Sequence, residues 1–167
     1  ATLRQLLRPG DAAPGAPRAL ILAPTRELAA QIDANLRDYG RFLKLRSAVI
    51  FGGVSARPQE AALRRGVDIV VATPGRLLDL MGTGAVRLSE VVWAVLDEAD
   101  QMLDLGFFPS IRRIMGKVPK QRRTALFSAT MPDPIRALAE EFLCSPQEVQ
   151  VTPVARPAEL HAALDPK

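Results

Sequence analysis

Three carboxylates fall within four residues of the sequence, in the run Asp97-Glu98-Ala99-Asp100. They follow an uninterrupted apolar run, Val91-Val92-Trp93-Ala94-Val95-Leu96, which is typical of a buried β-strand. An acid that ends a buried strand can hold Mg²⁺ on a nucleotide, and the next acid can orient an attacking water. We therefore expect nucleotide and metal chemistry here, with helix capping by the same acids as the alternative.

Two further clusters, Pro24-Thr25-Arg26-Glu27 and Thr73-Pro74-Gly75-Arg76, each join a predicted strand to a predicted helix. Free backbone N–H groups at a helix start bind phosphate, and each cluster adds a hydroxyl and an arginine. The clusters therefore predict binding of a sugar-phosphate backbone. For Thr73-Pro74 the alternative is an ordinary helix start, with Thr as N-cap and Pro in the first turn, and both interpretations can hold together.

Two weaker clusters complete the set. Gly52-Gly53 permits close approach of a ligand backbone, or simply a tight turn. Ser128-Ala129-Thr130 carries two hydroxyls that could bond a neighbouring carboxylate such as Asp100, although a plain helix start explains them as well.

The elements that must position these clusters alternate along the chain. Short apolar runs predict strands at 19–23, 47–51, 68–72, 91–96, 124–127 and 148–151, and helical periodicity predicts helices at 26–42, 58–65, 74–81, 108–115 and 133–142. This alternation predicts an α/β fold with a parallel sheet and helices on both faces. Because ligands bind at the carboxyl edge of such a sheet, all five clusters should lie on one face of the molecule.

Composition narrows the class of protein. The 167 residues favour one domain, and the single cysteine excludes an internal disulfide and fits a reducing compartment. The sequence contains no apolar run long enough to span a membrane and no signal-peptide core at its start. We expect a soluble, cytoplasmic protein without membrane contact.

The net charge of +4 is compatible with nucleic-acid binding, and equally with the base composition of the gene. Aromatic residues make up only 5% of the chain, which argues against a base-stacking platform. Any nucleic acid would therefore be held mainly by its backbone.

In order and spacing, the five clusters resemble motifs of the first RecA-like domain of DEAD-box ATP-dependent RNA helicases. The similar stretch runs from Arg18 to Val151. In chain order it includes Ala23-Pro24-Thr25-Arg26-Glu27-Leu28-Ala29 as motif Ia, Gly52-Gly53, Thr73-Pro74-Gly75-Arg76 as motif Ib, Asp97-Glu98-Ala99-Asp100 as motif II and Ser128-Ala129-Thr130 as motif III. The run from Asp97 to Phe107 is further similar to the bacterial RhlE-like subgroup. The resemblance implies a three-layer fold of the P-loop NTPase type. It also implies ATP and Mg²⁺ as cofactors of the parent protein, and single-stranded or duplex RNA as its partner.

The resemblance also implies roles for individual residues. Asp97 would coordinate Mg²⁺ through water, Glu98 would position the hydrolytic water, and Asp100 would bond to Ser128 and Thr130, coupling nucleotide state to RNA. The RNA backbone would lie along the residues of the remaining motifs: Pro24, Thr25, Arg26, Gly52, Gly53, Thr73, Pro74, Gly75 and Arg76.

One part of the family pattern is absent from the sequence. No G-x-x-x-x-G-K-[ST] loop occurs, since the only Gly-Lys pair, Gly116-Lys117, is followed by Val118. We therefore expect a truncated domain over 1–152 that begins just after the phosphate loop and lacks its strand, and a linker over 153–167 toward a missing second RecA-like domain.

The missing loop leads to three expectations for the chain. The chain should bind no ATP, and it should be inactive alone. The strand edges exposed by the loss of the loop and its strand should favour self-association. The alternative function is an ATP-independent RNA-binding or regulatory module.

Overall fold

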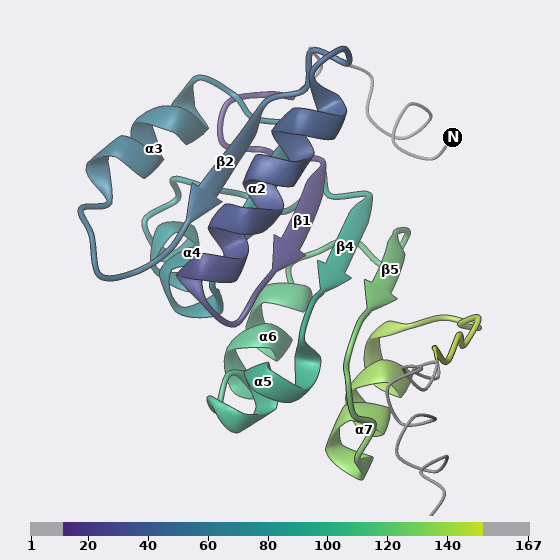
Figure 1. Cartoon of the computed structure of the whole chain (residues 1–167). Coiled ribbons are helices and arrows are strands. Elements are labelled where there is room, and N and C mark those ends of the chain that lie inside the picture. The colour runs from purple at the N-terminus through teal and green to yellow at the C-terminus, as the bar shows by residue number, and fades with distance from the viewer. Residues whose placement is uncertain (1–11, 152–167) are drawn as a thin grey trace, which may run out of the picture.

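A computed structural model describes residues 12–151 of the chain. Its centre is a five-stranded sheet in the order β2-β3-β1-β4-β5, with every neighbouring pair parallel (Figure 1). The strands are β1 (Ala19–Leu22), β2 (Ser47–Ile50), β3 (Ile69–Ala72), β4 (Trp93–Leu96) and β5 (Arg123–Leu126). The predicted α/β fold with a parallel sheet is confirmed.

The described helices lie between and after the strands. They are α2 (Arg26–Gly40), α3 (Arg57–Arg64), α4 (Pro74–Gly82), α5 (Ala99–Asp104), α6 (Phe108–Met115) and α7 (Asp133–Phe142). The predicted bounds of α6 and α7 are correct. The prediction did not assign α5 as a helix, although capping of a helix by the motif II acids was its stated alternative.

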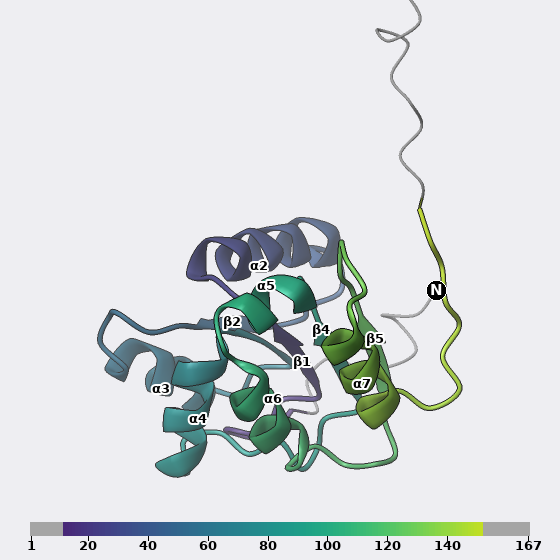
Figure 2. The same ribbon diagram turned by 90° about the horizontal axis from the view of Figure 1, so that it is seen from below.

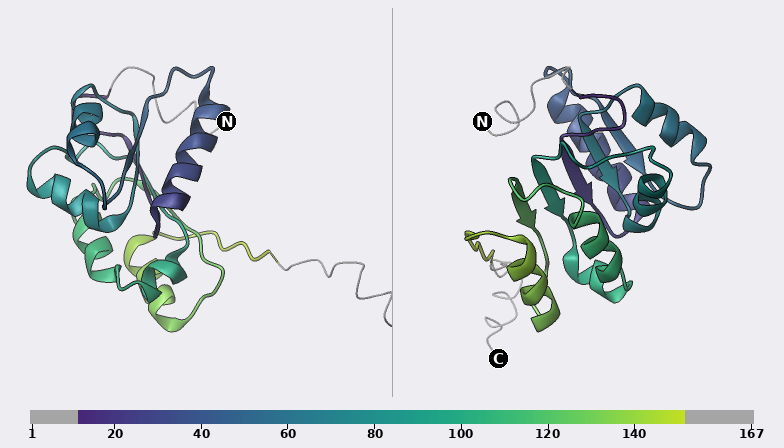
Figure 3. Two further views of the ribbon diagram at one scale, coloured as in Figure 1. Left: turned by 60° about the vertical axis from the view of Figure 1, so that its left-hand side comes forward. Right: turned by 180° about the vertical axis from the view of Figure 1, so that it is seen from behind.

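The helices form layers on both faces of the sheet (Figures 2 and 3). Side chains alternate across a strand, so Leu20 and Leu22 of β1 face the core shared with α3, α4, α6 and α7. Ala19 and Ile21 face the smaller core beneath α2. The apolar sequence of β3 is buried on both faces, as expected for a strand inside a parallel sheet.

The predicted sixth strand at 148–151 is wrong. This segment has no regular structure, and Val149 and Val151 are 76% and 88% exposed. The alternation of valine with polar residues favours a strand, but a strand also needs a neighbour for its backbone N–H and C=O groups. Within residues 12–151, the sheet ends at β5 and supplies no such neighbour beside this segment.

The outer side of β5 is the open edge of the sheet next to α7 (Figure 1). The backbone N–H groups of Arg123 and Phe127 donate to Val92 and Leu96 on the β4 side. Alternation along a strand therefore directs the N–H groups of Thr124 and Leu126 away from β4, toward the open side.

The predicted linker over 153–167 lies outside the described residues. Within the part that the structure describes, no helix combines the length and apolar character needed to cross a membrane.

Candidate nucleotide and RNA site

All five sequence clusters follow the carboxyl ends of strands on one edge of the sheet. The last residues of β1, β3 and β4 are in register, since Leu22 lies opposite both Ala72 and Leu96. The clusters after these three strands therefore begin at the same level. The chain thus gathers carboxylates, hydroxyls, glycines and arginines along one edge, where parallel α/β sheets bind ligands.

Motif II begins directly at the end of β4. The Asp97 N–H still belongs to the sheet and donates to the Leu22 carbonyl at 3.0 Å. The Asp97 carboxylate accepts the N–H of Glu98 at 2.9 Å through Oδ1. The other carboxylate oxygen has no partner among residues 12–151, so it is available to a ligand at the strand end.

Glu98 adopts the left-handed backbone region, with φ +50° and ψ +55°. This conformation is uncommon for residues other than glycine and costs energy, and it is found most often at functional sites. It places an exposed carboxylate at the junction between β4 and α5. The left-handed backbone therefore marks Glu98 as a candidate functional position.

Asp100 is joined to Ser128 and Thr130 by a compact hydrogen-bond network. Its backbone N–H donates to Ser128 Oγ at 3.2 Å, and its Oδ2 accepts both the N–H and the hydroxyl of Thr130, each at 3.1 Å. Ser128 Oγ in turn donates to the Thr130 carbonyl at 2.6 Å. The network connects the first turn of α5 to the loop after β5.

The same network sets the ionisation of Asp100. Burial acts to raise the pKa of its carboxyl, but hydrogen bonds from Thr130 and from the Gln101 N–H stabilise the carboxylate more. The pKa of Asp100 therefore lies below its usual value. At neutral pH the group is an anion that accepts hydrogen bonds.

Motif Ia forms the start of α2. Thr25 is the N-cap and its hydroxyl accepts the Leu28 N–H at 3.2 Å. Arg26 and Glu27 are exposed and form an ion pair at 2.9 Å, which lowers the pKa of Glu27. Pro24 is buried, so it positions the loop from inside.

The glycine pair after β2 makes an open turn. Gly53 has φ +79°, which favours glycine, and the space where a side chain would project from either glycine is empty. Turn geometry thus accounts for Gly53, while the empty space leaves room for a ligand backbone.

Motif Ib forms the start of α4, and its arginine contacts the segment that follows the glycine pair. Thr73 and Pro74 occupy the N-cap and first position of α4, although the Thr73 side chain makes no capping bond, and Gly75 is exposed. Arg76 is mostly buried. Its Nη2 donates to the Val54 carbonyl at 2.8 Å, while Nη1 is buried without a partner among the described residues. Arg76 therefore ties α4 to the glycine turn.

Gln59, which belongs to none of the predicted clusters, holds the other side of that turn. Gln59 is buried and its Nε2 donates to the Phe51 carbonyl at 3.0 Å. The sequence did carry a signal, because Gln59 lies one helical turn before the buried Leu63 and so shares the inward face of α3.

The site fits Mg²⁺ only as a partner of a bound nucleotide. Within residues 12–151, no group of three or more His, Cys, Asp or Glu side chains is arranged to hold a metal alone. Mg²⁺ is usually bound by one or two carboxylates together with substrate phosphates, and a single carboxylate at a strand end matches that pattern. Asp97 is the residue that would hold the ion.

The fold is that of a RecA-like domain. Residues 1–138 match the DEAD/DEAH box helicase family, and the chain belongs to this family.

Similar proteins agree with this assignment. The chain is 49% identical over 138 residues to the ATP-dependent RNA helicase DBP2 of Gibberella zeae, and 48% identical to that of Chaetomium globosum. These matches cover 83% of this chain but 24% of each relative, so the chain spans about a quarter of their length.

Solved structures share the fold. A DEAD box protein from Methanococcus jannaschii has a TM-score of 0.72 at 39% identity, covering 81% of this chain and 37% of that one. The yeast DEAD-box splicing factor Prp28 has a TM-score of 0.73 at 37% identity, covering 77% and 31%. The RhlE-like subgroup stays a prediction.

Proposed function

We propose that the chain is part of an ATP-dependent RNA helicase, in which ATP hydrolysis drives RNA unwinding or remodelling. The main supporting observation is the Asp100–Ser128–Thr130 network. It links motif II, which carries the proposed nucleotide-site carboxylates, to the loop after β5 at the same edge of the sheet. Family membership and the names of the relatives support the proposal.

Each residue has a proposed role. Asp97 holds Mg²⁺ through water and Glu98 positions the hydrolytic water, while Asp100 couples the nucleotide state to the RNA edge. When bound, Mg²⁺ and ATP supply the reacting phosphoryl group and the charge that neutralises it. The RNA backbone lies along the helix N-caps Thr25 and Thr73 and along three exposed residues, Arg26, Gly53 and Gly75.

Arg76 acts on RNA indirectly in this proposal. Its guanidinium is engaged by the Val54 carbonyl and is mostly buried. We infer that it positions the glycine turn rather than reaching into solvent for phosphate. Replacing Arg76 by Lys should then weaken RNA binding, since an ammonium cannot reproduce the planar fork.

The chain alone should not hydrolyse ATP. The family's phosphate loop supplies the backbone cradle, the lysine and one Mg²⁺ ligand, and the 167 residues contain no such sequence. Calorimetry with Mg²⁺ and ATP should give no binding heat, and a phosphate-release assay should stay at background. ATP turnover that Glu98→Gln abolishes would contradict this expectation.

A second candidate function is ATP-independent RNA binding by a regulatory module. The observation that favours it is that the motifs proposed to contact RNA lie at strand ends of the described sheet and are positioned there by contacts within the chain itself. RNA affinity that is unchanged by ATP and Mg²⁺, in the longest natural protein carrying this chain, would favour the module. We place either form in the cytoplasm.

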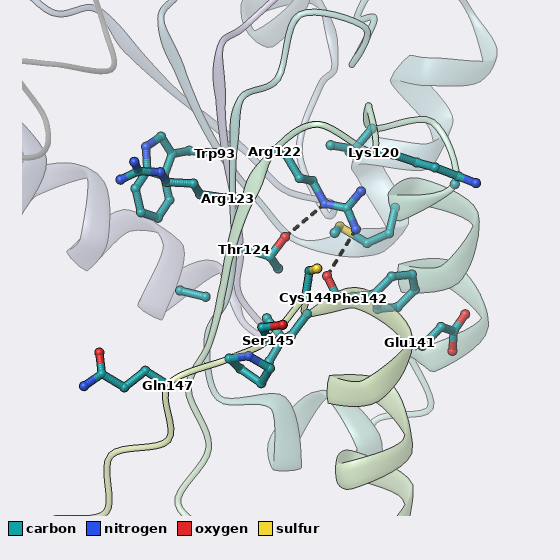
Figure 4. A pocket seen from close by; sticks show the side chains of 16 residues that line it. Trp93, Lys120, Arg122, Arg123, Thr124, Glu141, Phe142, Cys144, Ser145 and Gln147 are labelled. Atoms are coloured by element: carbon teal, nitrogen blue, oxygen red, sulfur yellow. Dashed lines mark hydrogen bonds between the residues drawn. The ribbon is translucent and has the colours of Figure 1, made fainter.

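We also propose that the chain self-associates through the open edge of β5. A cavity of about 1080 Å³ runs along this edge, bounded by Trp93, Arg122, Thr124, Phe142 and other residues (Figure 4). Open edges are templates for pairing with another strand. Arg122 lies beside the edge, bonded to Thr124 Oγ1 and the Phe142 carbonyl, and burial lowers the pKa of its guanidinium.

Sedimentation velocity can test this pairing. Thr124→Pro removes an N–H that points away from β4, so it should shift the chain toward monomer. Val49→Pro is the matched control, because Val49 lies on β2 at the opposite edge of the sheet. A chain that is monomeric without any substitution would disprove self-association.

A further inference from the structure

A groove on the α4 and α6 side of the molecule is lined by residues that have no part in the proposed helicase site. It lies where α4 and α6 run side by side (Figure 2), and it has a volume of about 680 Å³. Leu78 and Met81 of α4 form one wall, and the segment from Val86 to Ser89 forms another. Arg112, Arg113, Gly116 and Lys117 close the third side.

The floor of the groove is apolar. Val86 and Leu88 are each 2% exposed, and Leu78 and Met81 are half-buried at its surface. Half-buried apolar side chains in a concavity favour an apolar partner, because contact removes them from water.

The rim of the groove is positively charged. Arg87, Arg113 and Lys117 are exposed, and none has an ion-pair partner among residues 12–151. Arg112 is different, since it pairs with Glu141 of α7 at 2.9 Å. The described residues that line the groove include no Asp or Glu.

Helix electrostatics explain only part of this charge. Cations in the last turn of a helix complement its dipole, which accounts for Arg112 and Arg113 in α6. Arg87 belongs to no helix and stands on the opposite side of the groove. Cations therefore lie on two sides of the apolar floor, at the end of α6 and in the loop after α4.

We propose that this groove binds an acidic, amphipathic segment of a partner protein. Leu or Phe side chains of the segment fill the floor, and its Asp or Glu side chains pair with Arg87, Arg113 and Lys117. A nucleic-acid backbone satisfies the cations but leaves the apolar floor uncovered, so a peptide is the better fit. The groove is also lined by the C-terminal part of α4, whereas motif Ib lies at its N-terminus.

Fluorescence anisotropy with three labelled peptides tests the proposal on the 167-residue chain. The first peptide contains Leu, Phe, Glu and Asp, the second replaces each acid by Lys, and the third replaces each apolar residue by Ser. Only the first should bind measurably. Equal binding of the first and third would overturn the proposal, because it would show attraction to a basic protein without use of the apolar floor.

Charge reversal locates the binding surface. The triple variant Arg87→Glu, Arg113→Glu and Lys117→Glu should weaken binding of the first peptide by about tenfold or more, since three ion pairs are lost. The control triple Lys44→Glu, Arg64→Glu and Arg65→Glu makes the same change in net charge at other exposed positions and should bind normally. Equal losses in both variants would contradict a specific groove.

Two further readouts keep the outcome unambiguous. Met81→Gln removes part of the apolar wall without adding charge and should weaken the first peptide several-fold, with unchanged circular dichroism showing that the fold is intact. A single-stranded RNA should bind the groove triple and the control triple alike. An RNA loss confined to the groove triple would make this a nucleic-acid surface and overturn the proposal.

Discussion

At the scale of single residues, the hydrogen bonds around Asp100 control an ionisation. Thr130 donates twice to Asp100 Oδ2, so Thr130→Val should raise the pKa of Asp100 toward its ordinary value by removing the hydroxyl donor. A carbon-13 NMR titration of the Asp100 carboxyl measures this shift. Thr83→Val is the control. Thr83 Oγ1 donates to the Leu80 carbonyl at 3.2 Å at the end of α4, and α4 takes no part in the Asp100 network.

The sign of the linked stability change follows from the lowered pKa. The ionised carboxylate stabilises the fold above the ordinary Asp pKa, and this contribution is lost as pH falls through the lower pKa of the folded state. Thr130→Val should therefore cost about 1 kcal/mol near neutral pH, the usual value of one hydrogen bond. The difference from the parent chain should shrink in acid. A difference that grew below the ordinary pKa would contradict this assignment.

The left-handed backbone of Glu98 leads to a second prediction for a single residue. Glu98→Gly and Glu98→Ala both remove the carboxylate, but only glycine adopts this conformation without steric cost. The glycine variant should be more stable by about 1 kcal/mol in urea unfolding. An alanine variant more stable than the glycine variant, by the usual entropic difference of about 0.5 to 1 kcal/mol, would show that the backbone is not strained.

At the scale of elements, the start of α2 depends on one side chain. Thr25 caps the helix through Leu28, so Thr25→Ala should reduce the free energy of unfolding by about 1 kcal/mol. Thr25→Ser keeps the capping oxygen and should retain most of that energy. If serine and alanine were equally destabilising in urea unfolding, the methyl group rather than the cap would hold this helix start.

Element by element, periodicity predicted the fold where packing and pattern agree. The apolar spacing of α6 and the continuous apolar run of β3 are visible in the sequence, and each element forms as that pattern predicts. The segment at 148–151 carries the pattern of a strand but lacks a partner, and pairing is a property of the sheet rather than of the segment. Helix α5 is only six residues long, too short for periodicity to reveal it.

The site was predictable to a similar degree. The order of strands and clusters placed Asp97, Thr25 and Thr73 at one edge, because every parallel strand ends there. The burial of Arg76 against Val54 was not predictable, since it depends on two loops whose closeness arises only in the fold. The inward position of Gln59 could be read from its spacing to Leu63 in α3, but its bond to the Phe51 carbonyl arises only in the fold.

At the scale of the whole molecule, the carboxyl edge of the sheet should bind RNA through its phosphates. Contacts to phosphates release counterions, so log K should fall with log salt at a slope of about −0.7 per contact for a single strand. With about three to five phosphates held, the slope should lie between about −2 and −3.5. The 167 residues carry the five motif clusters of one RecA-like domain, so the affinity should be weak.

The measurement that tests this most directly is anisotropy of a labelled single-stranded RNA with the 167-residue chain over a range of salt. We expect weak binding with the slope given above, and Arg26→Ala should reduce the slope by about one contact, or 0.7. Lys44→Ala, at an exposed position near the end of α2, should leave the slope unchanged. Absence of salt-dependent binding, or the same slope in all three proteins, would contradict RNA binding at this edge.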